Sequence, residues 1–503
     1  MQLLTPRQCR RVEQAFLGQG LGSEAMMIDS AGRAAAKVAQ EIFGPLLGKQ
    51  VLLLCGKGHN AADGLIAAKC LLDEGVRVVA ALAFPREELA PETVKALDQA
   101  LRAGLRIESD HAGLGAHADH SDLTVDALVG TAARLPLEGK LAELARWTER
   151  AAPPVLALDL PSGVDGESGA VTGPCVKATV TLSFLAGKPG LFLEPGRSHA
   201  GKVRVHDFAD AGLARLVSAE STIRAFDHAA AAAALPPRPF DAHKKQACLL
   251  IVAGSQEYLG AALLCARAAY RGGAGLVRLA LPQALAQTAV AALPEAVVLA
   301  LPEAGSLGEP SLDALLATLK DSEALVVGPG LGRAPSTQAL VRALWRQAAR
   351  PALFDADALH ALALGENPGG ARVLTPHEGE LKALLGPQAL GNGRPAAARA
   401  LAAAAGAVAL LKGPATLVAR PDGGLSINTS GSAVLASAGT GDVLSGLIGA
   451  LLAQGQEAFD AASLGAWVHG RSGDRWAALN AGRGLLAGDL ADGLPAALHE
   501  IGA

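Results

Sequence analysis

Aromatic side chains are scarce in this chain of 503 residues, where they make up 3% of the total. So few rings argue against a platform that stacks nucleic-acid bases. The formal net charge is −4 and no run of basic residues occurs, which argues against the positive footprint of a nucleic-acid-binding protein. The six cysteines form no Cys-x-x-Cys pair and most fall in apolar segments, so we expect reduced, buried thiols in a cytoplasmic protein.

Long hydrophobic runs are also missing, although hydrophobic residues make up 50% of the chain. No uninterrupted apolar run reaches the ~18–20 residues that a membrane span requires. The first residues, MQLLTPRQCRRVEQ, lack the apolar centre of a signal peptide. We therefore predict neither a membrane segment nor a signal peptide. A chain of this length exceeds what one hydrophobic core supports, so two or three domains are expected.

A glycine-rich stretch, SAGTGDVLSG at Ser437–Gly446, leads into an apolar run. This pattern predicts a tight turn that opens a buried helix. The free N–H groups and the positive dipole end of such a helix attract phosphate, and glycines allow close approach. Asp442 has two interpretations: it caps these N–H groups itself, or it acts as a base on a hydroxyl beside the bound phosphate.

The first half of the chain alternates between short apolar runs and helical patterns, from Val51–Cys55 to Val155–Leu158. Such alternation predicts a doubly wound α/β domain with a buried parallel sheet. Polar residues follow three of the expected strands, in GKGHNAADG (Gly56–Gly64), DALVGTAARLP (Asp126–Pro136) and LDLPSGVDG (Leu158–Gly166). Together they could form one site at the carboxyl ends of the strands, or they are ordinary turn formers.

A proline-rich stretch near residues 236–239 marks a plausible domain junction, after which a second α/β series begins at Leu249. Its motifs differ from those of the first half, so we predict two unlike α/β domains. In TPHEGE (Thr375–Glu380), Thr375 as N-cap and Glu378 predict a capping box that leaves His377 unexplained. Lys412 is either a solvated charge or a phosphate ligand.

A histidine-containing segment, with His111, His117 and His120 near Asp119 and Asp122, fits no standard zinc spacing. We expect a solvated loop there.

The three motifs of the first half, with KPGLF (Lys188–Phe192) and GKV (Gly201–Val203), resemble the epimerase domain of the bifunctional NAD(P)H-hydrate repair enzyme family. The resemblance implies a Rossmann-like YjeF-type fold over residues 1–215. It implies that Asn60, Asp126 and Ser162 bind a potassium ion, and Asp159 is our candidate acid or base. The implied substrate-binding residues are His59, Asn60, Ala61, Ala62, Asp63, Gly130, Thr131, Ala132, Ala133, Arg134, Leu135, Pro136 and Asp159.

The first of these loops departs from the pattern usual in the family, NNGGDG, because Ala61 and Ala62 replace two glycines. Alanine tolerates positive φ poorly and its methyl group limits close approach. Either these positions keep negative φ or the pocket is altered.

The motifs of the second half resemble the dehydratase domain of the same family, which has a ribokinase-like fold. They are GS…YLGA, RGGAGLV, GPGLG, DADAL, TPHEGE, KGPAT and AGTGDVLSG, in the family's order. We assign this domain to residues 241–503, with a linker at 216–240. The resemblance implies that Ala261, Gly330, His377 and Asp442 contact the hydrate. It implies a nucleotide site made by Lys412, Gly413, Pro414, Ala415, Thr416 and Gly441.

The expected function is repair of hydrated NADH and NADPH (NADHX and NADPHX). The first domain would interconvert the R and S epimers, and the second would dehydrate the S form with ADP and Mg²⁺, giving AMP and phosphate. Two alternatives stay open: a ribokinase-like kinase of vitamin precursors, or a dehydratase with an inactive N-terminal module. Alanine-rich helical faces suggest self-association into a homo-oligomer.

Overall fold

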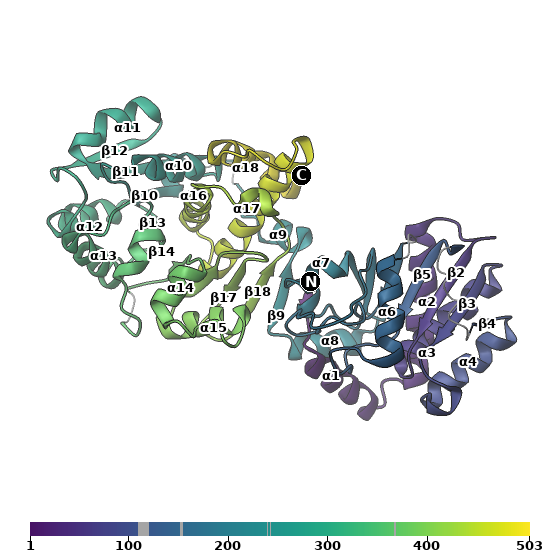
Figure 1. Ribbon diagram of the computed structural model, residues 1–503. Helices are drawn as coiled ribbons and strands as arrows, with labels where there is room; N and C mark the ends of the chain where they lie inside the picture. The colour runs from purple at the N-terminus through teal and green to yellow at the C-terminus, as the bar shows by residue number, and fades with distance from the viewer. Residues whose placement is uncertain (109–119, 151–153, 239, 242, 367–368, 503) are drawn as a thin grey trace. The chain divides into compact units, whose positions relative to one another are not determined.

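The computed structural model describes residues 1–108, 120–150, 154–238, 240–241, 243–366 and 369–502 (Figure 1). The chain divides into two compact units, Met1–Arg224 and Ala225–Ala503. None of the described helices is long and apolar enough to cross a membrane.

The first unit is built on a parallel sheet with the strand order β4-β3-β2-β5-β6-β7-β8. Its strands are β2 (Gln50–Cys55), β3 (Arg77–Leu82), β4 (Arg106–Ile107), β5 (Leu123–Ala127), β6 (Val155–Leu158), β7 (Val180–Phe184) and β8 (Lys202–His206). Side chains of β2 alternate between two hydrophobic clusters: Leu53 packs with α2, α3 and α4, whereas Leu52 and Leu54 pack with α6. Helices therefore cover both faces, which confirms the predicted three-layer α/β fold.

Between β2 and β6 the described helices of this unit alternate with the strands as predicted, whereas the two helices that follow β7 lie beyond the segment for which the sequence predicted alternation. They are α1 (Pro6–Gly18), α2 (Glu24–Phe43), α3 (His59–Asp73), α4 (Pro91–Arg102), α6 (Gly139–Arg150), α7 (Gly196–Ala200) and α8 (Ala211–Glu220). Thr5 caps α1 in a capping box with Gln8, and Pro6 occupies the first helical position. Helix α3 starts directly after the glycine-rich turn that follows β2, so its first residues lie at the carboxyl end of the sheet.

The second unit has a larger sheet with the order β18-β17-β16-β15-β14-β13-β10-β11-β12. Strands β10 to β16 pair with their neighbours in parallel. At the edge of these, β17 pairs antiparallel with β16, and β18 pairs antiparallel with β17. The bounds are β10 (Cys248–Val252), β11 (Leu276–Pro282), β12 (Val297–Leu301), β13 (Ala324–Val327), β14 (Ala352–Phe354), β15 (Arg372–Leu374), β16 (Val408–Leu411), β17 (Leu417–Ala419) and β18 (Leu425–Asn428). This order differs from that of the first unit, so the two units are unlike, as predicted.

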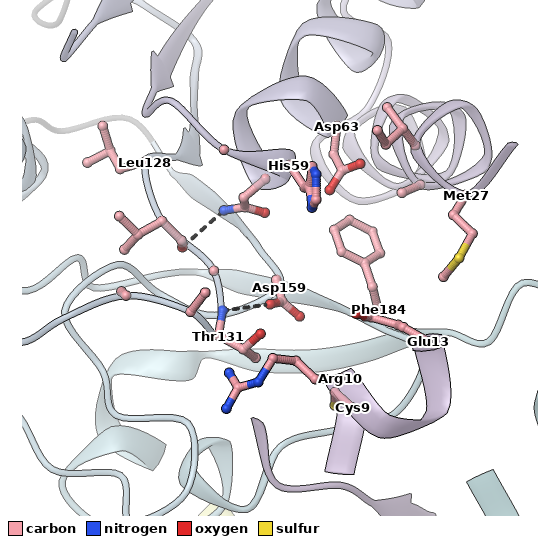
Figure 2. A pocket seen from close by; sticks show the side chains of 18 of the residues that line it. Cys9, Arg10, Glu13, Met27, His59, Asp63, Leu128, Thr131, Asp159 and Phe184 are labelled. Carbon is pink, nitrogen blue, oxygen red and sulfur yellow. Dashed lines mark hydrogen bonds between the residues drawn. The ribbon is translucent and has the colours of Figure 1, made fainter. Parts of the chain in front are cut away.

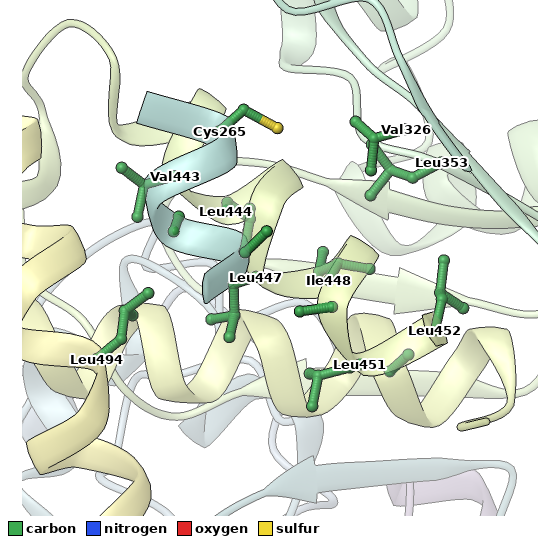
Figure 3. Packing of buried hydrophobic residues seen from close by; sticks show 14 of the residues in the cluster. Cys265, Val326, Leu353, Val443, Leu444, Leu447, Ile448, Leu451, Leu452 and Leu494 are labelled. Carbon is green, nitrogen blue, oxygen red and sulfur yellow. The ribbon is translucent and has the colours of Figure 1, made fainter. Parts of the chain in front are cut away.

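Helix α16 lies at the centre of the second unit's core. The helices are α9 (His228–Ala234), α10 (Leu259–Arg271), α11 (Ala286–Ala292), α12 (Leu312–Lys320), α13 (Pro335–Gln347), α14 (Glu378–Leu385), α15 (Arg394–Ala405), α16 (Thr440–Ala453), α17 (Ala458–Leu479) and α18 (Ala487–Gly502). Apolar residues surround α16 on several sides, among them Cys265 of α10, Val326 of β13 and Leu494 of α18 (Figure 3). A Cβ atom on Gly446 would lie 2.0 Å from the carbonyl oxygen of Cys265, so glycine allows the close contact with α10. On the other face of the sheet, Trp345 of α13 packs edge-on against Phe354.

The segment 216–240, predicted as a linker, contains regular structure. It holds the end of α8, the strand β9 (Ile223–Phe226) and the helix α9. The alanine-rich α9 has no apolar stripe to reveal it, and β9 is too short to give a clear pattern.

Candidate active sites

A cavity of about 670 Å³ lies at the carboxyl end of the first unit's sheet. Its walls come from α1, from the start of α2 and α3, from the loop after β5 and from the ends of β6 and β7 (Figure 2). The predicted site residues that line it are His59, Asn60, Asp63, Gly130, Thr131, Ala132, Ala133, Arg134 and Asp159. The three strand-end motifs thus meet in one place, as the alternation of strands and helices predicts.

Asp159 follows β6 directly and has the unusual backbone angle φ 66°. Its backbone N–H donates to Leu182 O at 2.7 Å, and its Oδ2 accepts the backbone N–H of Thr131 at 3.1 Å (Figure 2). A left-handed conformation at a residue other than glycine persists where the surrounding structure determines it. Here it aims a carboxylate into the cavity beside residues 130–136, which we call the GT loop.

Lys188 holds the other oxygen of this carboxylate. Its ammonium group donates to Asp159 Oδ1, to Ser183 Oγ at 3.1 Å and to Phe184 O at 2.8 Å, and its side chain is 2% exposed. Burial disfavours the charged ammonium and is the largest single effect, but the charge and hydrogen bond of Asp159, together with Cys9 and Glu13, outweigh it and raise the pKa of Lys188. Lys188 therefore stays charged inside the fold and has no N–H left for a ligand.

Asn60, Asp126 and Ser162, which were predicted to bind potassium, cluster around the backbone of Val129. Asn60 Nδ2 donates to Val129 O at 3.0 Å, and the Ser162 hydroxyl accepts Val129 N–H at 3.1 Å. Ser162 also donates to Asp126 Oδ1 at 2.7 Å. Burial raises the pKa of Asp126 to about 6, although hydrogen bonds from Ser162 and Leu128 oppose the shift. Asn60 Oδ1 is buried and has no hydrogen-bond partner among the described residues.

Two more carboxyl groups line the cavity, Glu13 from α1 and Asp63 from α3. Burial raises the pKa of Glu13 from 4.5, and it raises the pKa of the 7%-exposed Asp63 well above its ordinary value. The negative charge of Asp159 adds to both shifts. The cavity thus contains one carboxylate that is paired with a cation and two carboxyl groups that are biased toward the protonated form.

The two alanines that replace glycine lie in the first turn of α3, and neither has a positive φ. Ala61 and Ala62 therefore both keep negative φ, so alanine fits these positions without backbone strain. Ala61 and Ala62 are fully buried in the core and are not among the lining residues. Leu135 and Pro136 also lie outside the lining, with Leu135 packed against the cluster under α6.

In the second unit, the predicted glycine-rich turn and buried helix are confirmed, and Asp442 lies in the first turn of α16. Burial raises the pKa of Asp442 to about 6, Asp355 adds to this shift, and Lys412 opposes it. A Cβ atom on Gly441 would lie 3.7 Å from Lys412 Nζ, so this ammonium group stands beside the N-terminus of α16. Positive charge from the helix dipole and from Lys412 therefore converges where the sequence predicts phosphate.

Asp355 anchors Lys412 in this position. Lys412 Nζ lies 2.8 Å from Asp355 Oδ1, and Ser445 of α16 donates to Asp355 Oδ2 at 2.7 Å. Burial alone would raise the pKa of Asp355, but Lys412 and these hydrogen bonds lower it. On α17, burial lowers the pKa of His469 to about 4, so the neutral ring donates Nε2–H to Thr440 O at 2.9 Å. This contact fixes the start of α16.

Ala261 and Gly330 lie close together on this side of the sheet. A Cβ atom on Gly330 would lie 3.0 Å from the Cβ of Ala261 and 2.6 Å from the carbonyl oxygen of Tyr258, so glycine is required by both space and its φ of 62°. A Cβ atom on Gly439 would lie 2.8 Å from Leu264, one turn after Ala261 on α10, and 4.0 Å from Asp442 Oδ2. The start of α10 and the start of α16 therefore flank the same space.

The predicted cap of α14 is wrong in its register. The N-cap is His377, whose Nδ1 accepts the N–H groups of Gly379 at 2.9 Å and Glu380 at 3.2 Å. Glu380 completes the capping box by accepting His377 N–H at 2.8 Å. Pro376 cannot start the helix because its carbonyl oxygen accepts Lys412 N–H at 2.9 Å, which continues the pairing of β15 with β16. His377 therefore has a structural role that the sequence did not reveal.

The nucleotide loop predicted at Lys412–Thr416 wraps around Arg394 of α15. The guanidinium group donates to Lys412 O at 3.1 Å, to Pro414 O and to Ala415 O at 3.4 Å. It also pairs with Glu378 at 3.0 Å. Hydrogen bonds from Arg394 to three carbonyl oxygens of the loop therefore fix the conformation of its backbone.

Comparisons with known proteins agree with these motifs. A family model described as YjeF-related protein N-terminus matches residues 24–190, and one described as NAD(P)H-hydrate dehydratase matches residues 249–496. The bifunctional NAD(P)H-hydrate repair enzyme of Moorella thermoacetica is 35% identical over 522 aligned residues, covering 100% of this chain and 97% of the relative. The chain belongs to the bifunctional NAD(P)H-hydrate repair enzyme family.

A second family member and one solved structure agree with this assignment. The enzyme of the same name from Salinibacter ruber is 36% identical over 505 residues, covering 96% of this chain and 93% of the relative. A hypothetical protein of Streptococcus mutans aligns with a TM-score of 0.50 at 22% identity, covering 56% of this chain and 100% of that one, and shows the fold alone.

Several residues at these sites received no role from sequence. Glu13 lies on a helix without any motif, so no local signal could single it out. Lys188, Asp355 and Glu380 belong to motifs shared with the family. For Asp355 the available signal was its place directly after the buried strand β14, whereas Lys188 and Glu380 do not directly follow a strand. His111, His117 and Asp119 lie outside the described residues, whereas Asp122 accepts Gln50 N–H at 2.9 Å.

Proposed function

We propose that this protein repairs hydrated NADH and NADPH. The first unit interconverts the R and S epimers of the hydrate, and the second unit dehydrates the S epimer at the expense of ADP, giving NAD(P)H, AMP and phosphate. The observation that carries the proposal is the position of Asp442 beside Lys412 at the N-terminus of α16, in a chain that matches this family over its full length.

The dehydration overcomes a poor leaving group. Asp442 takes the proton from the ring hydroxyl, whose oxygen attacks the terminal phosphorus of ADP while AMP leaves. The ring nitrogen then expels phosphate from the same carbon, and the neighbouring carbon loses a proton to form the ring double bond. A carboxylate whose pKa is about 6 suits a general base near neutral pH. Lys412 and the backbone amides at the start of α16 stabilise the negative charge that develops on the transferred phosphoryl group.

A magnesium ion fits the charge and the donors of this region. Such an ion usually keeps several waters and would be held by phosphates of the nucleotide and by one or two carboxylates. Asp355 and Glu380 lie 2.8 and 3.8 Å from Lys412 Nζ and would be those carboxylates. Bound magnesium would neutralise charge on the phosphates. Ala261, Gly330 and His377 would contact the hydrate, and Gly441 with residues 412–416 the nucleotide.

Epimerisation requires inversion at the carbon that carries the hydroxyl, and Asp159 is the candidate acid or base. A potassium ion fits these oxygens, because Asn60 Oδ1 is buried and has no hydrogen-bond partner in the described part of the chain, while the backbone of Val129 links the Asn60 side chain to Ser162, which bonds Asp126. These residues would hold the ion, which would order the GT loop. Asn60, Asp63, the GT loop and Asp159 would bind the hydrate.

The test is recovery of dihydronicotinamide absorbance from a mixture of both NADHX epimers, with ADP or ATP, magnesium and potassium. Complete recovery is expected. A plateau that leaves one epimer would mean that the first unit does not epimerise. A stable phosphorylated product without recovery would mean a kinase, and would overturn the proposal. Sedimentation velocity on the same sample tests the expected self-association.

A further inference from the structure

The first unit's cavity holds a carboxyl group, Glu13, to which nothing so far gives a role. We propose that Glu13 is a catalytic acid that works with Asp159 as base, and that Lys188 is the positioning residue that keeps these two carboxyl groups in opposite protonation states. This inference rests on the proposed epimerase activity and names the groups that perform it.

The carboxyl groups of Glu13 and Asp159 lie in the same cavity, and no hydrogen bond among the described residues joins them. Glu13 projects from α1 and Asp159 from the end of β6, and both line the same cavity (Figure 2). Asp159 is fixed on both oxygens, by Lys188 and by Thr131 N–H. No hydrogen bond from the described part of the chain engages the Glu13 carboxyl, so it is available to a ligand.

Charge around Glu13 sets its protonation. Burial and Asp159 raise its pKa, whereas Lys188, His59 and Arg10 lower it. Asp63 also faces this group, since Glu13 contributes to its raised pKa. The ammonium of Lys188 bonds Asp159 directly, whereas no such contact from the described residues holds the Glu13 carboxyl, whose pKa burial raises. Two carboxyl groups with unlike environments are the usual arrangement for paired acid and base roles.

This pair can invert the hydrated carbon by opening and closing the ring. Asp159 takes the hydroxyl proton, the carbon–oxygen bond becomes a carbonyl, and the carbon–nitrogen bond breaks. Its electron pair passes to the ring nitrogen, which receives the proton of Glu13. After rotation about the adjoining single bond, the nitrogen attacks the opposite face of the carbonyl and returns its proton to Glu13. Asp159 returns its proton to the oxygen, so the step is a balanced isomerisation without an external reactant.

The test follows interconversion of purified R- and S-NADHX by the full chain without nucleotide, with the uncatalysed rate subtracted. Glu13→Gln should lower kcat about 100-fold, since a general acid contributes at least this factor. It should also remove the fall in rate at high pH that an acid imposes. Lys188→Met should lower kcat and move the fall at low pH upward, because the Asp159 carboxylate has lost its cation. Glu220→Gln is the matched control, because Glu220 pairs with Arg11 on α1 outside the cavity.

Two further measurements keep a folding defect apart from lost chemistry. The thermal unfolding midpoint of each variant is measured in parallel. Glu13→Asp, which keeps an acid, should epimerise at least tenfold faster than Glu13→Gln. If Glu13→Gln epimerises at the wild-type rate with an unchanged pH profile, the inference is wrong while the proposed function stands. If the wild-type chain does not epimerise, the proposed function of this unit fails instead.

Discussion

Asp442→Asn should remove the dehydratase activity and at the same time stabilise the second unit. Burial raises the pKa of this carboxyl from 3.8 to about 6, which corresponds to about 3 kcal/mol when each pKa unit is worth ~1.4 kcal/mol. Because Asp442 is partly exposed, solvent screening reduces this value, and we expect a gain of about 1–2 kcal/mol in the free energy of unfolding at pH 8.

The pH dependence of this gain follows from linkage. Below pH 3.8 the group is neutral in both the folded and the unfolded chain, so the substitution has little effect. As pH rises from 3.8 to about 6, the unfolded chain ionises while the folded chain holds its proton, and folding becomes less favourable. Above pH 6 the full penalty is present. The advantage of the asparagine variant should therefore appear between pH 4 and 6 and then stay constant.

Urea unfolding followed by tryptophan fluorescence measures this effect, because Trp345, Trp467 and Trp476 all lie in the second unit. Asp313→Asn, at an exposed position of α12, is the control and should change stability by less than about 0.5 kcal/mol. ADP binding should persist in Asp442→Asn, while turnover falls at least 100-fold. An equal effect at pH 4 and pH 8, or a loss of stability at pH 8, would refute the electrostatic reasoning. Near-full turnover would refute the role as base.

Other predictions concern the helix starts and the nucleotide loop. Ala62→Gly should lower the stability of the first unit by about 1 kcal/mol, since Ala62 lies inside α3, and leave the epimerisation rate within twofold; a tenfold faster rate would contradict this. Arg394→Met should raise the KM for ADP about tenfold with a smaller change in kcat, whereas Arg342→Met on α13 should not; equal KM values would show that Arg394 does not support the loop. Gly446→Ala should cost about 1–3 kcal/mol in urea unfolding, because its methyl group would meet Cys265 O at 2.0 Å; an unchanged midpoint would mean that α10 and α16 separate easily.

Sequence patterns were sufficient for features that depend on neighbouring residues. The start of α16 follows from the glycines before Asp442. The strand-end motifs predicted that polar residues of the first unit converge, because parallel strands end at the same edge of a sheet. The unlike motifs of the two halves also predicted two unlike domains, and the strand orders of the two sheets do differ.

Features that depend on distant pairing were not predictable in this way. His377 caps α14 because the Pro376 carbonyl is used by Lys412, which is far along the chain. Glu13 reaches the cavity only because α1 packs against this end of the first unit. Nor could the glycine-to-alanine changes be judged from sequence, since their effect depends on whether residues 61 and 62 belong to the turn or to the helix.

The two units resolve one electrostatic problem in the same manner, although their folds differ. Each places a lysine with little exposure on a carboxylate at a strand end, Lys188 on Asp159 and Lys412 on Asp355. Each then places a second, less strongly held carboxyl group nearby: Glu13 in the first unit, and Asp442, whose pKa is about 6, in the second. A lysine that satisfies one carboxylate leaves the other to the effects of burial, which favour the neutral form. Removing either lysine should therefore change the protonation of both carboxyl groups of its unit, so lysine variants should alter pH profiles more than they alter substrate affinity.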